Sequence, residues 1–314
     1  YNLYWSAKSA EKLDKKDVAL DLYTRVIQHY PYTFHGISAK DRVRALGVNP
    51  DTLVQNKNPV PSEKVNTQLS RPLNKKERFH HIRANELAKL GLMREARNEI
   101  GELQKSIRKN LEGVLWLSQL YHQAQGYAES LRLLHLYKDF TTKPNEKNLS
   151  ENFWKHFFPL AYEEAVLAYA KSRKVDPFFV NGIIRQESLF DSQALSPAGA
   201  RGLMQIMPAT GKKLYPKTKL KKPFETDALF DPELNIRLGV KYVSQLNKRF
   251  GKNGMHILIS YNAGPHVLKK WLKRFGHLSD QDVFIESIPY PETRRYVKHV
   301  LRNLGIYKAL YSPS

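Results

Sequence analysis

The sequence contains no cysteine, no long apolar run and far fewer acidic than basic residues. Without cysteine, disulfides, thiolate catalysis and cysteine-based zinc sites are excluded, although the absence is compatible with any compartment. No stretch approaches the ~18 apolar residues that a membrane-spanning helix needs, so we expect no stable membrane insertion. Alternating runs of valine and isoleucine are scarce, and helix-forming residues dominate. This composition predicts a mostly α fold.

The acidic deficit leaves a strongly basic chain. Lysine and arginine number 51 against 30 acidic residues, which gives a net charge of +21 and a pI of about 9.8. Such a charge favours a polyanionic partner, namely nucleic acid, an anionic membrane or an acidic cell-wall polymer, unless it is only a solvated lysine-rich surface. The chain has neither a recognition helix rich in arginine and asparagine nor an aromatic RNA-binding motif. We therefore expect no nucleic-acid partner.

A chain of 314 residues is long for a single core, which favours two domains. Residues 1–150 show stacked helix pairs, with breaks near Leu13–Lys16, Gly91 and Gly126. They are similar to tetratricopeptide-type hairpins, although the period is too irregular for that motif. Arrays of this kind bind or position a partner.

Two segments interrupt this pattern. The polar, proline-rich residues 49–72 are interpreted as an irregular excursion or linker, and residues 143–150 (KPNEKNLS) as the domain boundary. The first residues, YNLYWSAKSAEKL, already have a helical pattern and lack the features of a signal peptide. Because a helix that begins at the first residue has no cap, we expect a fragment or a processed form.

Residues 151–314 carry the candidate chemistry. After a segment expected to be helical, FFPLAYEEAVLAYAKSRK, comes VDPFFVNGIIRQESLF, in which Asp176 and Pro177 are a suitable N-cap and first helical residue. Val180, Ile184 and Glu187 then fall on one face of that helix, so a glutamate occupies a position typical of leucine. A desolvated carboxyl has a raised pKa and can act as a general acid near neutral pH. Spacing alone leaves open that Glu187 lies at the helix end and turns to solvent or to an arginine.

The next segment, SPAGARGLMQIMP, has small residues that allow the backbone to approach a bulky ligand. Gln205 offers one amide among apolar side chains, as ligand grooves commonly do. An ordinary tight loop with methionine packing is the alternative. The helix that follows, DPELNIRLGVKYVSQLNKRF, is interpreted as scaffold.

Two further motifs lie near the C-terminus. LISYNAGPHVLKKWL places Tyr261 and Asn262 at a helix end, and FIESIPYPETRRYVKHVL places Pro291 at a helix start with Glu292 directly behind it. Tyrosine and asparagine at a turn are often caps, and the helix dipole alone favours an acidic residue in the first turn.

In order and spacing, these three motifs resemble those of the soluble lytic transglycosylases of glycoside hydrolase family 23, over roughly Phe157 to Tyr311. The resemblance implies a goose-lysozyme-like, mostly α-helical catalytic domain in residues 151–314, preceded by a superhelical region in residues 1–150. It also implies a location in the periplasm or bacterial cell envelope, with peptidoglycan glycan strands as partner. We expect a monomer that needs no cofactor or metal.

The resemblance assigns roles to individual residues. Glu187 would be the sole catalytic acid and base, Tyr261 would form a hydrogen bond near it, and Glu292 would contact substrate or orient the loop. Ser196 and Gln205 would touch the sugar or its N-acetyl group, and Met204 and Met207 would line the groove. Asn262 is the remaining predicted substrate-binding residue.

The implied reaction cleaves the β-1,4 bond from N-acetylmuramic acid to N-acetylglucosamine without water and yields 1,6-anhydromuramyl ends. A glycosidase usually needs two carboxylates, but one suffices when the nucleophile is a substrate hydroxyl held in position. Asp191, one turn beyond Glu187, is expected to be a surface residue or loop cap. The alternatives are a hydrolytic goose-type lysozyme, which would need a further carboxylate, and a non-catalytic cell-wall-binding scaffold.

Overall fold

The computed structural model of the protein describes residues 1–53, 69–108, 110–136, 151–218 and 223–312. Over these residues the secondary structure is helical, apart from two isolated β-bridges that pair Leu195 with Arg201 and Arg201 with Ile206. The prediction of an all-α fold is confirmed. None of the helices in these ranges is long and apolar enough to cross a bilayer. The chain divides into two compact units, Tyr1–Pro159 and Leu160–Ser314.

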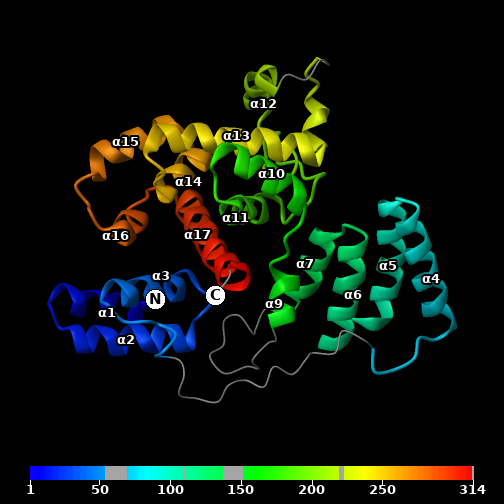
Figure 1. Ribbon diagram of the computed structural model, residues 1–314, viewed down its shortest axis with the longest axis horizontal. Coiled ribbons are helices and arrows are strands. Elements are labelled where there is room, and N and C mark those ends of the chain that lie inside the picture. The colour runs from blue at the N-terminus through cyan, green and yellow to red at the C-terminus, as the bar shows by residue number, and fades with distance from the viewer. Residues whose placement is uncertain (54–68, 109, 137–150, 219–222, 313–314) are drawn as a thin grey trace. The chain divides into compact units, whose positions relative to one another are not determined.

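The first unit is built from helix pairs (Figure 1). The pair at its start comprises α1 (Asn2–Lys12) and α2 (Lys16–His29), and α3 (Phe34–Ala45) packs on α2. Their shared core holds fully buried aromatic and aliphatic side chains, among them Tyr4, Tyr23 and Ile27. Most of the predicted excursion at residues 49–72 lies outside the described residues.

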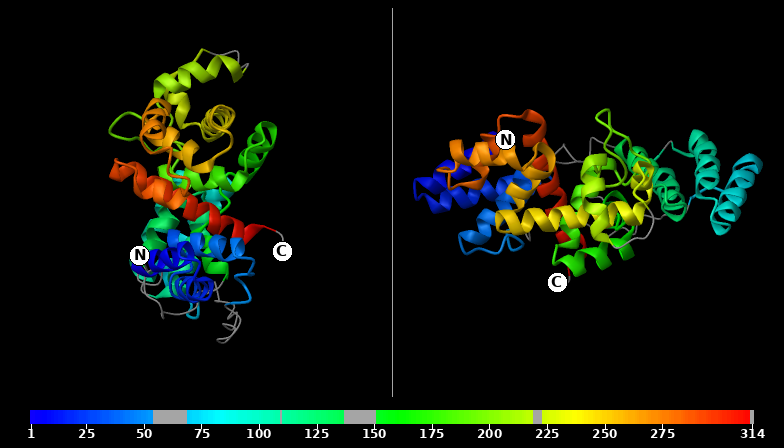
Figure 2. Two further views of the ribbon diagram at one scale, coloured as in Figure 1. Left: turned by 90° about the vertical axis from the view of Figure 1, so that its left-hand side faces the viewer. Right: turned by 90° about the horizontal axis from the view of Figure 1, so that it is seen from above.

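The other helices of this unit also pack in sequence, and Figures 1 and 2 show α4 and α5 side by side. They are α4 (Lys75–Lys89), α5 (Met93–Ile107), α6 (Leu111–Gln123), α7 (Tyr127–His135) and α9 (Glu151–Phe157). The breaks predicted near Gly91 and Gly126 are confirmed. The segment 143–150, expected to form the boundary, lies outside the described residues.

The second unit contains every residue to which the sequence assigns chemistry. Its helices are α10 (Glu163–Arg173), α11 (Pro177–Ser188), α12 (Pro208–Leu214), η1 (Tyr215–Thr218), η2 (Thr226–Phe230), α13 (Pro232–Phe250), α14 (Gly254–Ala263), α15 (Pro265–Phe275), α16 (Gln281–Glu286) and α17 (Pro291–Tyr311). The long α13 packs on α10 and α14, and α17 packs on α11 and α14 (Figure 1).

The expectation of a continuous helix over FFPLAYEEAVLAYAKSRK is wrong. Helix α9 ends at Phe157 and α10 begins only at Glu163. Pro159 has no N–H to donate within a helix. Tyr162 has a φ of 54°, in the left-handed region that a continuing helix does not allow.

Helices α11 and α17 cross at Gly182. A Cβ atom at this position would lie 3.4 Å from the carbonyl oxygen of Val300, which is an ordinary contact, so the crossing accommodates a methyl group there but is close enough to exclude a large side chain. The buried Asn303 of α17 donates a hydrogen bond from Nδ2 to the Gly182 carbonyl oxygen, at 3.3 Å. This contact fixes the register of α17 against the helix that carries Glu187.

A side-chain series at Gly182 tests this account. Gly182→Ala adds only an ordinary contact and gains helix propensity, so its free energy of unfolding should equal or slightly exceed that of the parent. Gly182→Leu should lower the free energy of unfolding by about 1–3 kcal/mol, because the larger side chain forces the helices apart. Urea unfolding measures both values, and equal stability of the two variants would contradict a close crossing.

Candidate active site

Glu187 lies in the last turn of α11. Asp176 caps this helix by accepting a hydrogen bond at Oδ1 from the backbone N–H of Phe178, at 2.8 Å, and Pro177 occupies the first turn. Val180 and Ile184 are fully buried on the same face. The side chain of Glu187 continues this face and is partly buried. The position at which the sequence predicts leucine therefore holds a carboxyl group.

The hydroxyl of Tyr296 is the direct partner of this carboxyl group. It donates a hydrogen bond to Oε1 of Glu187 at 2.7 Å, and only 5% of the tyrosine surface is exposed. Tyr296 belongs to α17, so the α11–α17 crossing brings the two side chains together. Tyr296 has no role in the prediction from the sequence. The signal that the sequence offers is a tyrosine among the apolar residues of α17, Val297 and Val300, both fully buried.

The pKa of Glu187 is raised to about 7. Burial is the main cause, because desolvation penalises the ionised carboxylate. The hydrogen bond from Tyr296 opposes this rise by stabilising the charge, and the negative charge of Glu292 adds to it. A carboxyl with this pKa exists in both protonation states near neutral pH, as a group that donates and then accepts a proton requires.

Tyr261, at the end of α14, is tied to the loop after α11. Its hydroxyl donates a hydrogen bond to the carbonyl oxygen of Met204 at 2.7 Å. Its pKa is raised well above the usual value, first by burial and then by the nearby negative charge of Glu187. Tyr261 thus lies in the electrostatic neighbourhood of Glu187 and also holds the loop.

The loop that joins α11 to α12 begins with two residues, Leu189 and Phe190, that have positive φ angles of 53° and 65°. This reversal separates the loop from the axis of α11. Ser188, the last residue of α11, holds the later part of the loop against the helix, because the serine hydroxyl donates to the carbonyl oxygen of Leu203 at 2.8 Å. Asp191 accepts a hydrogen bond at Oδ1 from the N–H of Gln193 at 2.9 Å, which is the loop cap that the sequence predicts.

Asn235 of α13 holds the same loop in place through side-chain hydrogen bonds. Its fully buried side chain donates from Nδ2 to the carbonyl oxygens of Arg201 and Leu229, at 2.8 and 2.7 Å. Its Oδ1 accepts a hydrogen bond from the N–H of Met204 at 2.7 Å. From its sequence this helix is predicted to be scaffold, and Asn235 has no predicted role, although an asparagine beside the inward-facing Ile236 is a possible signal.

Two glycines allow this fit. Gly202 has a φ of 74°, and a Cβ atom there would lie 2.3 Å from the carbonyl oxygen of Leu229. A Cβ atom on Gly239 of α13 would lie 2.2 Å from Sδ of Met204. Backbone and side chain of the loop therefore rest directly on α13.

The other loop residues singled out by the sequence divide into internal and exposed ones. Met204 is fully buried, whereas Met207 is 42% exposed. Gln205 donates from Nε2 to the carbonyl oxygens of Ala194 and Gly202, both at 3.0 Å. The hydroxyl oxygen of Ser196 accepts a hydrogen bond from the N–H of Ala200 at 3.0 Å.

Asn262 and Glu292 meet at a pocket. This pocket has a volume of about 390 Å³ and is lined by Asn262, Ala263, Tyr290, Pro291, Glu292 and Thr293. The hydroxyl of Thr293 donates to Oδ1 of Asn262 at 2.6 Å, which joins the end of α14 to the start of α17. Glu292 is exposed one turn before Tyr296 on α17. The pocket is thus connected through α17 to the partner of Glu187.

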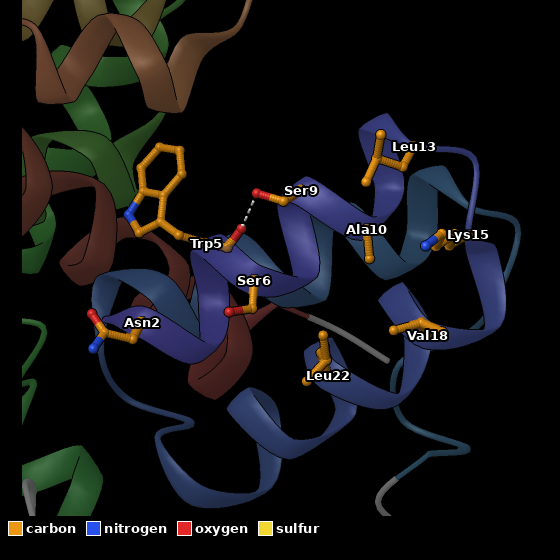
Figure 3. Close-up of a pocket in the computed structure, with 9 residues that line it drawn as sticks. All are labelled: Asn2, Trp5, Ser6, Ser9, Ala10, Leu13, Lys15, Val18 and Leu22. Atoms are coloured by element: carbon orange, nitrogen blue, oxygen red, sulfur yellow. Dashed lines mark hydrogen bonds between the residues drawn. The ribbon is translucent and has the colours of Figure 1, made fainter.

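A larger hollow of about 550 Å³ lies on the α1–α2 hairpin in the first unit (Figure 3). Its lining includes Trp5, Ser9 and Lys15 and contains no acidic or histidine side chain. The hydroxyl of Ser9 is already used, because it donates to the carbonyl oxygen of Trp5 at 2.9 Å. The hollow therefore offers no carboxyl or imidazole group, and the candidate active site is the one around Glu187.

Comparison with known proteins agrees with this choice. Residues 164–284 match the family model described as the transglycosylase SLT domain. The soluble lytic murein transglycosylase of Escherichia coli is 35% identical over 166 residues, which are 52% of this chain and 26% of that protein. A membrane-bound lytic murein transglycosylase E from Buchnera aphidicola is 34% identical over 150 residues, which are 45% of this chain and 68% of that protein. The chain belongs to the SLT family of lytic transglycosylases.

Solved structures of this family resemble the chain along nearly its whole length. The 70-kDa soluble lytic transglycosylase of Escherichia coli has a TM-score of 0.75 at 26% identity, covering 98% of this chain and 45% of that one. An inactive mutant of Slt from Pseudomonas aeruginosa has a TM-score of 0.67 at 28% identity, covering 98% and 46%. The chain thus spans about half the length of these solved relatives. The resemblance identified from the motifs is confirmed.

The raised pKa of Glu187 predicts how stability depends on pH. Between the ordinary pKa of 4.5 and about 7 the folded state binds more protons than the unfolded state, so stability falls as pH rises through this window. Because the glutamine of Glu187→Gln cannot ionise, this variant should have a larger free energy of unfolding than the parent at pH 8, by up to about 3 kcal/mol. The difference should shrink towards pH 4. Urea unfolding across this range measures it, and a constant difference would contradict a desolvated carboxyl.

Removal of the Tyr296 hydroxyl should move the titration of Glu187. Because the hydrogen bond lowers the pKa of Glu187, Tyr296→Phe should raise that pKa above about 7, as followed by NMR of a labelled glutamate carboxyl. Tyr169→Phe is the matched control, since its hydroxyl donates to Oε1 of a different glutamate, Glu233, at 2.6 Å. Equal titration of Glu187 in parent and Tyr296→Phe would show that the bond does not stabilise the charge.

Proposed function

We propose that this protein is a peptidoglycan lytic transglycosylase in which Glu187 acts first as an acid and then as a base. The observation that carries the proposal is a partly buried carboxyl held by the Tyr296 hydroxyl at 2.7 Å, in surroundings that raise its pKa to about 7. Family membership supports the substrate, since several relatives are named murein transglycosylases. It also supports a location in the periplasm or cell envelope.

In the first step, neutral Glu187 gives its proton to the glycosidic oxygen between N-acetylmuramic acid and N-acetylglucosamine. The C1–O bond breaks, the leaving sugar departs with a free hydroxyl, and positive charge develops on the muramyl ring. The newly formed carboxylate is stabilised in place by the hydrogen bond from Tyr296.

In the second step, the carboxylate of Glu187 takes the proton from the C6 hydroxyl of the same muramyl residue. The C6 oxygen bonds to C1 and closes the 1,6-anhydro ring, and Glu187 returns to its neutral form. No water is consumed. One carboxyl group serves both steps because the nucleophile belongs to the bound substrate and is already near C1.

Substrate contacts are assigned to groups around this centre. The pocket at the junction of α14 and α17 supports sugar contacts for Asn262 and Glu292. Met207 is exposed at the end of the loop after α11, whereas Met204 of the same loop is buried. Ser196 and Gln205 would present their remaining hydrogen-bonding groups to the N-acetyl sugar.

A hydrolytic lysozyme reaction is the second candidate. It is favoured by one observation, namely that the charge of Glu292 reaches Glu187 strongly enough to raise its pKa. In that reaction a second carboxylate would activate water, and the muramyl product would retain a reducing end.

Mass spectrometry of sugars released from purified peptidoglycan tests the proposal. The parent should release anhydromuramyl ends, and Glu187→Gln should be slower by at least 10²–10⁴-fold, because an amide neither donates nor accepts the proton. Glu225→Gln, at an exposed position of the same unit, is the control for the loss of one carboxylate.

The products distinguish the candidates. Fragments heavier by one water would identify the hydrolytic reaction, and a matching loss of rate in Glu292→Gln would then assign the second carboxylate. Release of anhydromuramyl ends by Glu187→Gln at the parental rate would refute the role of Glu187.

A further inference from the structure

Helix α15 has two sharply different faces. Its inner face buries Val267, Leu268 and Trp271. Its outer face and the turn that follows carry an uninterrupted basic stripe of exposed side chains, spaced at three and four residues: His266, Lys269, Lys270, Lys273, Arg274 and His277. Residues at this spacing form one face of a helix. We name these six residues the α15 basic face.

The charge of the α15 basic face is not neutralised locally. Elsewhere in the unit basic side chains form ion pairs, such as Lys298 with Glu286 at 2.6 Å and Lys308 with Asp176 at 3.2 Å. Across the ranges that the structure describes, no carboxylate lies within salt-bridge distance of the lysines or the arginine of this face. Like charges at three- and four-residue spacing also destabilise a helix, so the stripe costs stability in the free protein.

The α15 basic face begins where the candidate substrate pocket ends. Asn262 and Ala263 line that pocket, and α15 starts two residues later, at Pro265. On the inner face, Trp271 contacts the ring of Tyr290, another lining residue, edge to face with the ring centroids 5.0 Å apart. The same helix therefore supports the pocket with one face and presents cations with the other.

We propose that the α15 basic face binds the carboxylates of the peptides attached to the glycan strand, while the strand itself occupies the site at Glu187. This inference rests on the proposed function, because it names the part of the same polymer that lies beyond the pocket. A glycan without peptides keeps only the lactyl carboxylate of each muramyl residue, which lies close to the sugar ring. Negative charge that extends away from the glycan towards this face therefore comes from the peptides.

The chemistry of the face favours these carboxylates over a membrane surface. A helix that binds a bilayer inserts apolar side chains between the lipids, whereas the apolar residues Val267, Leu268 and Trp271 are turned into the protein. Three of the four permanent charges are lysines, which act as flexible point charges and suit carboxylates on mobile peptides better than one fixed geometry. Exposed pairs of this kind are screened by salt.

The variant Lys269→Gln/Lys270→Gln/Lys273→Gln tests the proposal. A matched control, Lys171→Gln/Arg173→Gln/Lys174→Gln, removes three exposed positive charges from the end of α10, which packs on α11 and α13. Cleavage is measured on intact peptidoglycan and on the same strands after enzymatic removal of the peptides. Binding is measured by co-sedimentation with insoluble peptidoglycan, with Glu187→Gln added to each protein to prevent cleavage.

The α15 variant should lose roughly fivefold or more in kcat/KM and in affinity on peptide-bearing strands, because three exposed ion pairs are removed. The control should stay near the parental values, and the α15 variant should keep parental values on peptide-free strands. Added salt should weaken the parent towards the variant.

Parental binding and cleavage by the α15 variant on peptide-bearing strands would overturn the proposal. An equal loss on both kinds of strand would do so too, because the face would then contact the glycan itself. Loss of binding to vesicles of anionic phospholipid, with peptidoglycan binding retained, would assign the face to membranes instead. If no protein cleaves any strand, the proposed function fails, and co-sedimentation still decides what this face binds.

Discussion

The desolvation of one carboxyl group, Glu187, is the constraint on which the rest of the second unit depends. A neutral acid near pH 7 requires burial, yet the carboxylate that forms in the proposed reaction requires a hydrogen-bond donor. The side chain of Tyr296 satisfies both requirements, because its ring is buried beside Glu187 and its hydroxyl donates a hydrogen bond to the carboxyl group. The crossing of α11 and α17 brings the two side chains together. At that crossing Gly182 faces the backbone of α17, and a Cβ atom there would be in ordinary contact with Val300. The packing of two helices therefore sets the electrostatic properties of the site.

The loop after α11 follows a second rule, which is that buried polar groups must be paired. Asn235 accepts one backbone N–H and donates to two backbone carbonyls. The hydroxyl of Tyr261 donates to a further backbone carbonyl, that of Met204. A segment with little regular structure thus acquires a fixed shape from side chains on α13 and α14.

The sequence predicts correctly the helix ends that carry strong local signals. Asp176 with Pro177, and Pro291, mark starts that the structure reproduces, because caps and prolines act within a few residues. Glu187 could be selected because it interrupts an apolar stripe. Tyr296 and Asn235 could not be assigned roles, since their partners lie more than a hundred and about thirty residues away in the chain. The break between α9 and α10 was missed because its residues otherwise favour a helix.

Gly239 and Asn235 have a consequence for how such an enzyme can change. They lie one helical turn apart on α13, and together they shape the surface on which Met204 and Gly202 rest. The loop sequence and this short stretch of helix therefore form one heritable module, although about thirty residues separate them. A loop transplanted from a relative with different side chains at these two positions would no longer pack on α13. Exchange of this loop among relatives should succeed only when the loop and this stretch of α13 are exchanged together.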